Sequence, residues 1–371
     1  MQTGRSRFFD LFHRSLAEVE AGIDRIRYRE GRHDGKMVQM LTYAGYRNAD
    51  EARFGGRIVE YRTPLDAGES TLSKLRAMLA IYESDEVPGV RIVAEGYGGR
   101  HEAISDDEGY FEFRVPLNGR DLPEKTRWDE VTLSVESHEA KRTRVTAPVL
   151  APGTSRRIGV ISDIDDTVVE TGATNFLKNW RRVLVDQPGE RLAVPGASKL
   201  YRMLVLEHDA PHRPVFYVSS SPWNLYDVLV EYMALQSIPL GPIFLRDYGL
   251  SEHGPVGEHH EAHKGRALAT LFTTYPDLGF VLIGDSGQRD PQVYAEAARR
   301  FPGRVRAVYL RDVSPKHGQA AAPYVEDLAA MGVPVKLAAD TAAIAGHAAA
   351  HGLISPEAAA EIAADPKNAA V

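Results

Sequence analysis

The sequence predicts an α/β protein in which a β-sandwich domain precedes a doubly wound parallel sheet. Between about residues 37 and 149, apolar and polar side chains alternate with a period of two, which is typical of half-buried antiparallel strands. After residue 151, short apolar runs alternate with helical patterns, and this order predicts right-handed βαβ units around a parallel sheet. We therefore expect a β-rich accessory domain at 36–150 and an α/β domain at 151–350.

An amphipathic helix is predicted over residues 1–35, ahead of both domains. Its apolar residues recur three or four positions apart and so share one stripe: Phe9, Phe12, Leu16, Val19, Ile23 and Ile26. Two partners for this stripe stay open, the protein's own surface and the surface of a membrane.

The accessory domain is predicted from short alternating runs separated by turn residues. Its clearest strands are expected at Val90–Ala94, Phe111–Val115 and Val131–Val135. Asp106–Gly109 and Asn118–Gly119 have the composition of tight turns. One helix is expected between Leu72 and Tyr82, and the proline and glycine of Ala147–Thr154 predict a linker.

In the α/β domain, short apolar runs bounded by polar residues predict buried strands. They are expected at Ile158–Ser162, Val215–Val218, Ile243–Leu245, Phe280–Ile283 and Val305–Leu310. Alanine-rich helices are predicted from about Ala320, and residues 351–371 are expected to form a helical tail.

Composition excludes several classes of protein. The chain has 371 residues, no cysteine and a formal net charge of −7. Without cysteine there are no disulfides, thiolate zinc sites or cysteine nucleophiles, and an acidic chain is a poor ligand for nucleic acid. No run approaches the roughly 18 apolar residues of a membrane span. We expect a cytoplasmic protein, with peripheral membrane contact left open.

An acidic cluster ends the strand predicted at Ile158–Ser162, and it consists of Asp163, Asp165 and Asp166. Carboxylates buried at a strand end are costly unless a cation or hydrogen bonds compensate them. Asp285 and Asp290 follow another strand, and parallel strands bring their carboxyl ends to one edge of the sheet. This all-oxygen set suits Mg²⁺ rather than zinc.

A candidate anion site follows the strand predicted at Val215–Val218. Ser219–Ser221 precede Pro222, and Ser221 as N-cap with a proline at the first helical position predicts a helix start. The free amides of a helix N-terminus bind anions. Lys264, at the start of the segment HKGRALATLF, is a candidate source of positive charge.

Four ordered segments carry a family resemblance: SDIDDTV, YVSSSPWNLY, HKG and IGDSGQRDP. They resemble the catalytic domain of the App1-type Mg²⁺-dependent phosphatidate phosphatases, which is part of the haloacid dehalogenase superfamily. The resemblance covers roughly residues 145 to 350 and implies a Rossmann-like sheet of the haloacid dehalogenase type with a small cap. Because Thr171–Pro211 is too short for a large cap domain, an open site is expected, which suits a bulky or surface-bound phosphomonoester.

The resemblance implies a role for each acidic residue. Asp163 would be the nucleophile that forms an aspartyl-phosphate, and Asp165 would protonate the leaving alcohol and then activate water. The metal would be held by Asp163, the backbone carbonyl of Asp165, Asp285 and Asp290. Asp166 is an alternative to Asp290.

The remaining motif residues would contact the phosphate. By the same resemblance, Ser219 would hydrogen-bond the phosphoryl oxygens, a role that Ser220 can share, while Lys264 would steady the nucleophile and the phosphate. Ser220, Asn224 and Arg246 are the candidate substrate-binding residues.

Two competing signals are weaker. GDSGQ is similar to a serine-protease motif with Ser286 as nucleophile, but βαβ order contradicts the β-barrel that this motif requires. His259 and His263 have the spacing of zinc ligands, although the helix-flanking glutamate signature of such pairs is missing.

The expected function is hydrolysis of phosphatidate to diacylglycerol and phosphate by a Mg²⁺-dependent phosphatase. The reaction type rests on four motifs, whereas the lipid rests on the resemblance alone. Two alternatives stay open: a phosphatase of a soluble phosphomonoester or phosphoprotein, and a non-catalytic phosphate-binding module.

Overall fold

The computed structural model describes residues 30–33, 36–60, 86–135, 144–155, 157–164, 194, 196–205, 213–246 and 260–365. Several predictions fall outside these residues: the helix expected over most of 1–35, the helix between Leu72 and Tyr82, and Asp165 with Asp166. Most of the short insert Thr171–Pro211 also lies outside them.

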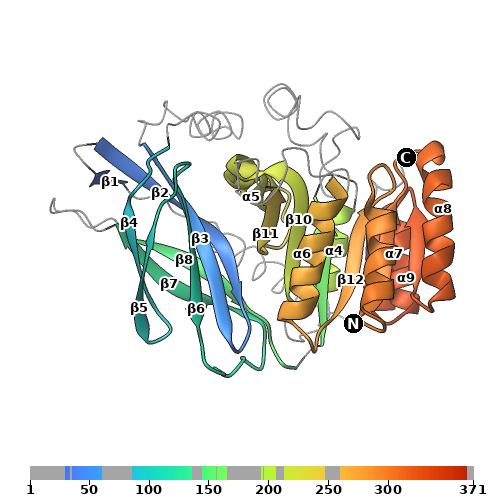
Figure 1. The fold of residues 1–371 in the computed structure, drawn as a ribbon. Coiled ribbons are helices and arrows are strands. Elements are labelled where there is room, and N and C mark those ends of the chain that lie inside the picture. Colours follow the sequence, from blue (N-terminus) through green and yellow to red (C-terminus); the bar gives the residue numbers. More distant parts are fainter. Residues whose placement is uncertain are drawn as a thin grey trace, which may run out of the picture. The chain divides into compact units, whose positions relative to one another are not determined.

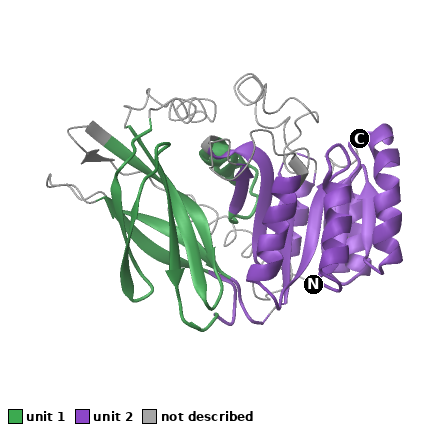
Figure 2. Ribbon diagram, in the orientation of Figure 1, with its two compact units in different colours: residues 1–122, 128–151, 224–242 green, residues 123–127, 152–223, 243–371 purple. Residues whose placement is uncertain are grey.

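Two compact units make up the chain, as Figure 2 shows. Unit 1 comprises residues 1–122, 128–151 and 224–242, and unit 2 comprises residues 123–127, 152–223 and 243–371. The chain passes from unit 1 to unit 2 between Ala151 and Pro152, and neither unit is one continuous stretch of chain.

Unit 1 is built on an eight-stranded sheet in the order β5-β4-β7-β8-β2-β3-β6, with β1 paired to β2 (Figure 1). Its strands are β1 Glu30–His33, β2 Lys36–Arg47, β3 Glu51–Glu60, β4 Arg91–Gly96, β5 Gly99–Ile104, β6 Tyr110–Pro116, β7 Arg127–Val135 and β8 Arg144–Ala151. The sheet is mixed, because β2 pairs in parallel with β8 and antiparallel with β3. The expectation of antiparallel strands alone is therefore wrong at the β2–β8 pair.

Alternation along the strands builds the core of unit 1. In β6, Phe111, Phe113 and Val115 are buried while their neighbours face outward, as the period of two predicts. Phe113 stacks on Phe54 of β3 with 5.2 Å between ring centroids. The predicted turn at Asn118–Gly119 is also present, with φ of 52° and 78°.

The linker predicted at Ala147–Thr154 is wrong over its first half. Residues Ala147–Ala151 belong to β8, where they are buried in the sheet. Pro148 lies within this strand, and a strand accepts proline at a position where the ladder does not use the amide.

Unit 2 contains a six-stranded parallel sheet in the order β11-β10-β9-β12-β13-β14. Its strands are β9 Ile158–Asp163, β10 Val215–Pro222, β11 Ile243–Arg246, β12 Gly279–Asp285, β13 Val305–Arg311 and β14 Val335–Ala338. The five predicted strands are confirmed, and β14, which is only half-buried, was not predicted. The order runs outward from the β9–β12 pair in both directions, and such a reversal creates a ligand crevice at the carboxyl ends of parallel strands.

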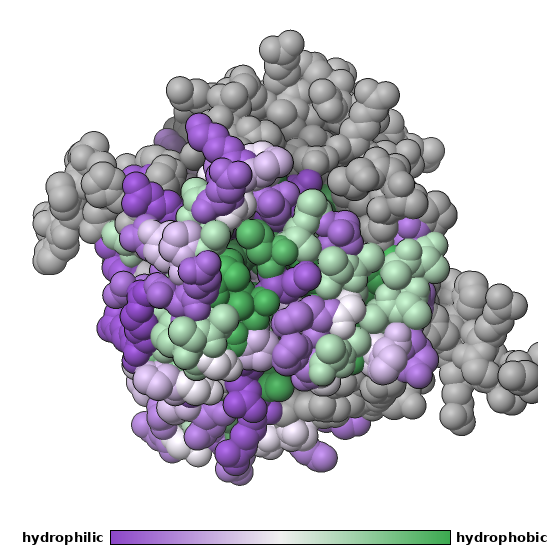
Figure 3. All heavy atoms as spheres, turned by 90° about the vertical axis from the view of Figure 1, so that its right-hand side faces the viewer, coloured by the Kyte–Doolittle hydropathy of each residue, from purple (hydrophilic) through white to green (hydrophobic). Residues whose placement is uncertain are grey.

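The helices of unit 2 are α4 Ala197–Val205, α6 His260–Thr274, α7 Asp290–Arg300, α8 Pro315–Ala330, α9 Thr341–Ala350 and α10 Pro356–Ala363. The last three begin at side chains that accept a backbone N–H: Ser314, Asp340 and Ser355. These are the alanine-rich helices that the sequence predicts. Figure 3 views the molecule from the side of α8 in Figure 1, where a central group of apolar residues is surrounded by hydrophilic ones.

One helix that lies between β10 and β11 in the sequence belongs to unit 1 and not to unit 2. It is α5, Tyr226–Leu235, and it follows the 3₁₀ turn η1 at Trp223–Leu225. None of the described helices has the length and apolar content needed to cross a membrane.

Candidate active site

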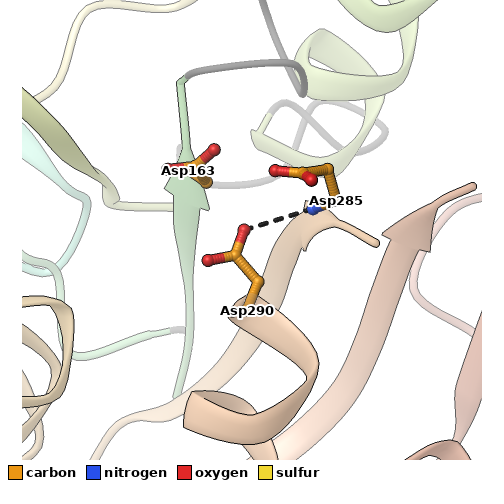
Figure 4. A group of neighbouring side chains, drawn as sticks. All are labelled: Asp163, Asp285 and Asp290. Carbon is orange, nitrogen blue, oxygen red and sulfur yellow. Dashed lines mark hydrogen bonds between the residues drawn. The ribbon is translucent and has the colours of Figure 1, made fainter. Parts of the chain in front are cut away.

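Three buried carboxylates meet at the carboxyl ends of β9 and β12, as Figure 4 shows. Asp163 ends β9, Asp285 ends the neighbouring strand β12, and Asp290 is the first residue of α7. One oxygen from each lies within 4.8 Å of the others, and the three side chains are at most 1% exposed. This grouping, expected from the sequence, is the kind of oxygen cage that binds a divalent cation.

The turn between β12 and α7 fixes two of these carboxylates. Oδ1 of Asp285 accepts backbone N–H groups from Gly287 at 2.5 Å and Gln288 at 2.8 Å. Oδ2 of Asp290 accepts the backbone N–H of Asp285 at 3.2 Å, the dashed line of Figure 4. Gly284 makes room for this contact, because a Cβ at that position would overlap the Asp290 carboxylate.

Lys264 connects the cluster to helix α6. Its ammonium lies 2.7 Å from Oδ1 of Asp163, donates to Oδ1 of Asp290 at 2.5 Å and donates to Oε1 of Gln288 at 3.2 Å. Burial lowers the pKa of Lys264, but Asp163, Asp290 and Asp285 together raise that pKa well above its ordinary value. The side chain therefore stays protonated at every physiological pH. It lies in the second turn of α6 rather than at its start.

Three buried serines lie near the carboxyl end of strand β10. Val218 pairs with Asp163 across β10 and β9, so Ser219, Ser220 and Ser221 follow at the same edge of the sheet. Oγ of Ser219 accepts the backbone N–H of Ser221 at 3.0 Å. Oγ of Ser220 is buried and has no hydrogen-bond partner among the described residues. A buried hydroxyl of this kind is ready to bind an oxyanion.

The predicted helix start at Ser221 and Pro222 is wrong. The strand continues through Pro222, which pairs with Arg246 of β11, and α5 begins only at Tyr226 after the 3₁₀ turn. The N-cap is Leu225, without a side-chain cap hydrogen bond. The three serines lie in an irregularity between the Val218–Phe244 and Pro222–Arg246 pairs, and pairing on both sides of them overrides the local preference of serine and proline to begin a helix.

The remaining residues predicted from the sequence lie in different elements, and some of them are outside the described residues. Arg246 ends β11 and Asn224 lies in η1, whereas Asp165 is outside the described residues. Nε2 of His263 lies 3.3 Å from the carbonyl oxygen of Phe244, whereas His259 is outside the described residues. The hydroxyl of Ser286 donates to Oδ1 of Asp312 at 2.9 Å, whereas the nucleophile of a serine protease is hydrogen-bonded to a histidine.

Several residues that shape the site were missed. Ser162 donates to the backbone oxygen of Asp163 at 2.7 Å and is hydrogen-bonded to the hydroxyl of Tyr201. Gln288 contacts Lys264, and Gly284 accommodates Asp290. The last two lie within IGDSGQRD, where a glycine next to an aspartate is a usable signal for a crowded backbone. Tyr201 has no such signal, because its contact joins distant parts of the chain.

Fold and cluster together define a protein with a parallel α/β sheet and a buried acidic site at its point of strand reversal. Residues 158–312 match the family model described as "Phosphatidate phosphatase APP1, catalytic domain". That segment includes every described residue of the acidic cluster and Lys264. The match supports an App1-type catalytic domain over these residues, as the sequence motifs indicate.

Two curated relatives align with less than half of the chain. The sequence is 32% identical over 154 residues to "Phosphatidate phosphatase APP1" of Saccharomyces cerevisiae, covering 42% of this chain and 26% of the yeast protein. It is 32% identical over 158 residues to an uncharacterized protein of Schizosaccharomyces pombe, covering 42% of this chain and 25% of the relative. The chain thus spans about a quarter of the length of these relatives.

Likeness to solved structures is weak. A β-glucuronidase of Bifidobacterium dentium aligns with 81% of this chain and 53% of its own, with 10% identity and a TM-score of 0.28. No conclusion about fold or function follows from a similarity at this level.

Proposed function

We propose that this protein is a Mg²⁺-dependent phosphatase that hydrolyses a phosphomonoester through an aspartyl-phosphate on Asp163. The observation that carries the proposal is the buried contact of Asp163 with Lys264, next to Asp285 and Asp290. A paired carboxylate and ammonium beside a candidate cation site meet the requirements of phosphoryl transfer, which depends on positioning and charge stabilisation.

The residues fit a magnesium ion. Three buried carboxylates against one lysine leave a local excess of negative charge, and their donor atoms are the hard oxygens that Mg²⁺ prefers. Asp163, Asp285 and Asp290 would hold the ion. When bound, Mg²⁺ would neutralise charge on the phosphate and orient it towards the nucleophile.

In the first chemical step, Asp163 is the nucleophile. Its carboxylate attacks phosphorus, an O–P bond forms, and the bond between phosphorus and the alcohol oxygen breaks. Asp165 donates a proton to the departing alcohol and later takes one from the water that hydrolyses the aspartyl-phosphate. The products are the alcohol and inorganic phosphate, with Asp163 regenerated.

Lys264 and the serines would stabilise the phosphoryl group. Because the neighbouring carboxylates raise its pKa, Lys264 keeps its charge throughout the cycle and holds the Asp163 carboxylate in place. The hydroxyl of Ser220, which has no hydrogen-bond partner in the described part of the chain, can donate to a phosphoryl oxygen, and Ser219 can do the same beside it.

The proposed substrate is phosphatidate, and the proposed products are diacylglycerol and phosphate. Support comes from the match of residues 158–312 to the App1 catalytic domain. We also propose that unit 2 has a sheet of the haloacid dehalogenase type with a small cap and that the strands of unit 1 form a β-sandwich. The protein is proposed to be cytoplasmic and to contact membranes peripherally.

Phosphate release tests the proposal. The purified full chain with Mg²⁺ should release phosphate faster from phosphatidate micelles than from soluble esters such as glycerol 3-phosphate. Asp163→Asn should lower kcat at least about 10³-fold, because the nucleophile is lost. Asp327→Asn makes the same chemical change at an exposed helical position and should retain wild-type activity.

Three outcomes would decide between the readings. Release only from soluble esters would keep the phosphatase and remove the lipid. An active Asp163→Asn enzyme would exclude the assigned nucleophile. Phosphate binding without release from any ester would identify a non-catalytic module.

A further inference from the structure

Ser286 lies inside the turn 285–290, which carries two of the three carboxylates of the acidic cluster. Its hydroxyl donates to Oδ1 of Asp312 at 2.9 Å and accepts the backbone N–H of Val313 at 3.1 Å. Its own backbone N–H donates to the carbonyl oxygen of Arg311, the last residue of β13, at 2.8 Å. This buried serine therefore ties the turn to the carboxyl end of β13 through three hydrogen bonds.

Asp312 is itself held from two sides. It directly follows β13, and its backbone N–H donates to the carbonyl oxygen of Ala338, the last residue of β14, at 2.9 Å. Helix α8 approaches its side chain so closely that a Cβ on Gly318 would overlap the carboxylate. Glycine inside a helix lowers stability relative to alanine, so its presence here indicates that the close approach is required. The acceptor of the Ser286 hydroxyl is therefore fixed by β14 and α8.

The same turn orients a metal ligand. Gly287 and Gln288, which follow Ser286, donate their backbone N–H groups to Oδ1 of Asp285 at 2.5 and 2.8 Å. These two amides keep their direction only while the turn keeps its shape, and Ser286 ties that shape to β13. Removing its hydroxyl would take away the acceptor of the Val313 amide and give the turn more freedom to adopt other conformations.

We propose that Ser286, held by Asp312, is a positioning residue that keeps the turn 285–290 in the geometry that binds a divalent cation. This assigns a role to the serine of the GDSGQ motif, which the proposed phosphatase reaction does not use. The inference rests on the proposed metal site for its effect on Mg²⁺ affinity. The positioning itself concerns only contacts within unit 2, between the turn and the end of β13.

Ser286→Ala tests the inference, because it removes the hydroxyl and keeps the backbone. Isothermal titration should show that Mg²⁺ binds about 10-fold more weakly, as expected when the support of a metal ligand is lost. Ser355→Ala is the matched control: the Ser355 hydroxyl accepts the backbone N–H of Ala358 at the start of α10, a helix that carries none of the acidic cluster. It should lower the melting temperature, as the loss of a helix cap does, and leave Mg²⁺ affinity unchanged.

Two variants of Asp312 separate the hydrogen bond from the charge. Asp312→Asn and Asp312→Ala both remove the carboxyl group, but only asparagine keeps an oxygen that can accept from Ser286. Asp312→Ala should therefore bind Mg²⁺ about 10-fold more weakly than Asp312→Asn. Equal affinities in these two variants would overturn the inference, and the comparison holds even if Ser286→Ala does not fold.

Hydrogen exchange followed by NMR separates failure of the inference from failure of the proposed function. Without metal, the amides of Gly287 and Gln288 should exchange about 10-fold faster in Ser286→Ala than in the wild type or in Ser355→Ala. A wild type that binds no Mg²⁺ would overturn the proposed metal site, and the exchange rates would still test the positioning. Wild-type exchange in Ser286→Ala would overturn the inference. Faster exchange with wild-type Mg²⁺ affinity would reduce Ser286 to a structural role and overturn it as well.

Discussion

Gly284 sets how closely the backbone of β12 approaches the Asp290 carboxylate. Gly284→Ala should displace that carboxylate, because the new Cβ would overlap it, and Mg²⁺ affinity should fall about 10-fold or more, as it does when the support of a metal ligand is removed. Isothermal titration with Mg²⁺ measures the change. Gly346→Ala is the control: nothing lies near its added Cβ in α9, so it should stabilise the protein by about 0.5–1 kcal/mol and leave Mg²⁺ affinity unchanged. Equal affinity in both variants would contradict this role of Gly284.

At the residue scale, the sequence identifies the charged groups of the site but few of their supports. Asp163, Lys264, Asp285 and Asp290 come together as their motifs predict, because parallel strands bring their carboxyl ends to one edge. The contact between Ser162 and Tyr201 could not be predicted. It depends on where α4 packs, and no local pattern encodes that.

At the scale of elements, α6 carries a second titratable side chain beside Lys264. The pKa of His263 lies below its ordinary value, and burial is the largest cause. The positive charges of Arg266 and Arg246 lower this pKa further, whereas a hydrogen bond to the backbone carbonyl of Phe244 raises it. Nε2 of His263 lies 3.3 Å from that carbonyl oxygen, and a backbone hydrogen bond at Ser219 also opposes the shift.

The consequence is a loss of stability in acid. A histidine whose pKa is lower in the folded state binds fewer protons than it does unfolded, so the free energy of unfolding falls as pH drops below the ordinary value of 6.5. Urea unfolding between pH 7.5 and 5.5 should show a shallower decline for His263→Gln, which keeps a donor without titrating. Parallel curves for the wild type and the variant would contradict the assignment.

Element boundaries were the least predictable part of the fold. The core strands of both units follow from apolar runs, but β10 runs on to Pro222 and β8 includes most of the expected linker. In both cases pairing with a neighbouring strand overrides the preference of proline and serine for turns and helix starts. The half-buried β14 was missed because a strand of four residues is too short for a periodic pattern to stand out in the sequence.

At the scale of the whole molecule, we expect the acidic cluster to lower the stability of the metal-free protein, because its carboxylates repel one another when no cation is bound. Three buried carboxylates face one ammonium, so one negative charge fewer should stabilise the protein when no metal is present. Asp285→Asn keeps an Oδ1 that can accept from Gly287 and Gln288. Its melting temperature without Mg²⁺ should exceed that of the wild type by about 2–4 °C, which corresponds to about 1 kcal/mol.

Adding the metal should reverse the order of stability. The wild type should gain about 2.7 kcal/mol at a Mg²⁺ concentration 100-fold above its dissociation constant, whereas Asp285→Asn should gain far less. Scanning calorimetry with and without Mg²⁺ measures both differences. Equal gains would show that Asp285 does not contribute to metal binding.

The division into units has a consequence for synthesis of the chain. Helix α5 completes unit 1 although it is encoded after the serine strand of unit 2. A nascent chain synthesised only as far as residue 151 has the strands of the β-rich sheet. It lacks Tyr226, whose hydroxyl oxygen accepts the backbone N–H of Ala44 at 2.6 Å. All eight strands of the sheet are thus encoded before residue 152, but the last residues of unit 1, 224–242, are encoded only after the first two strands of unit 2.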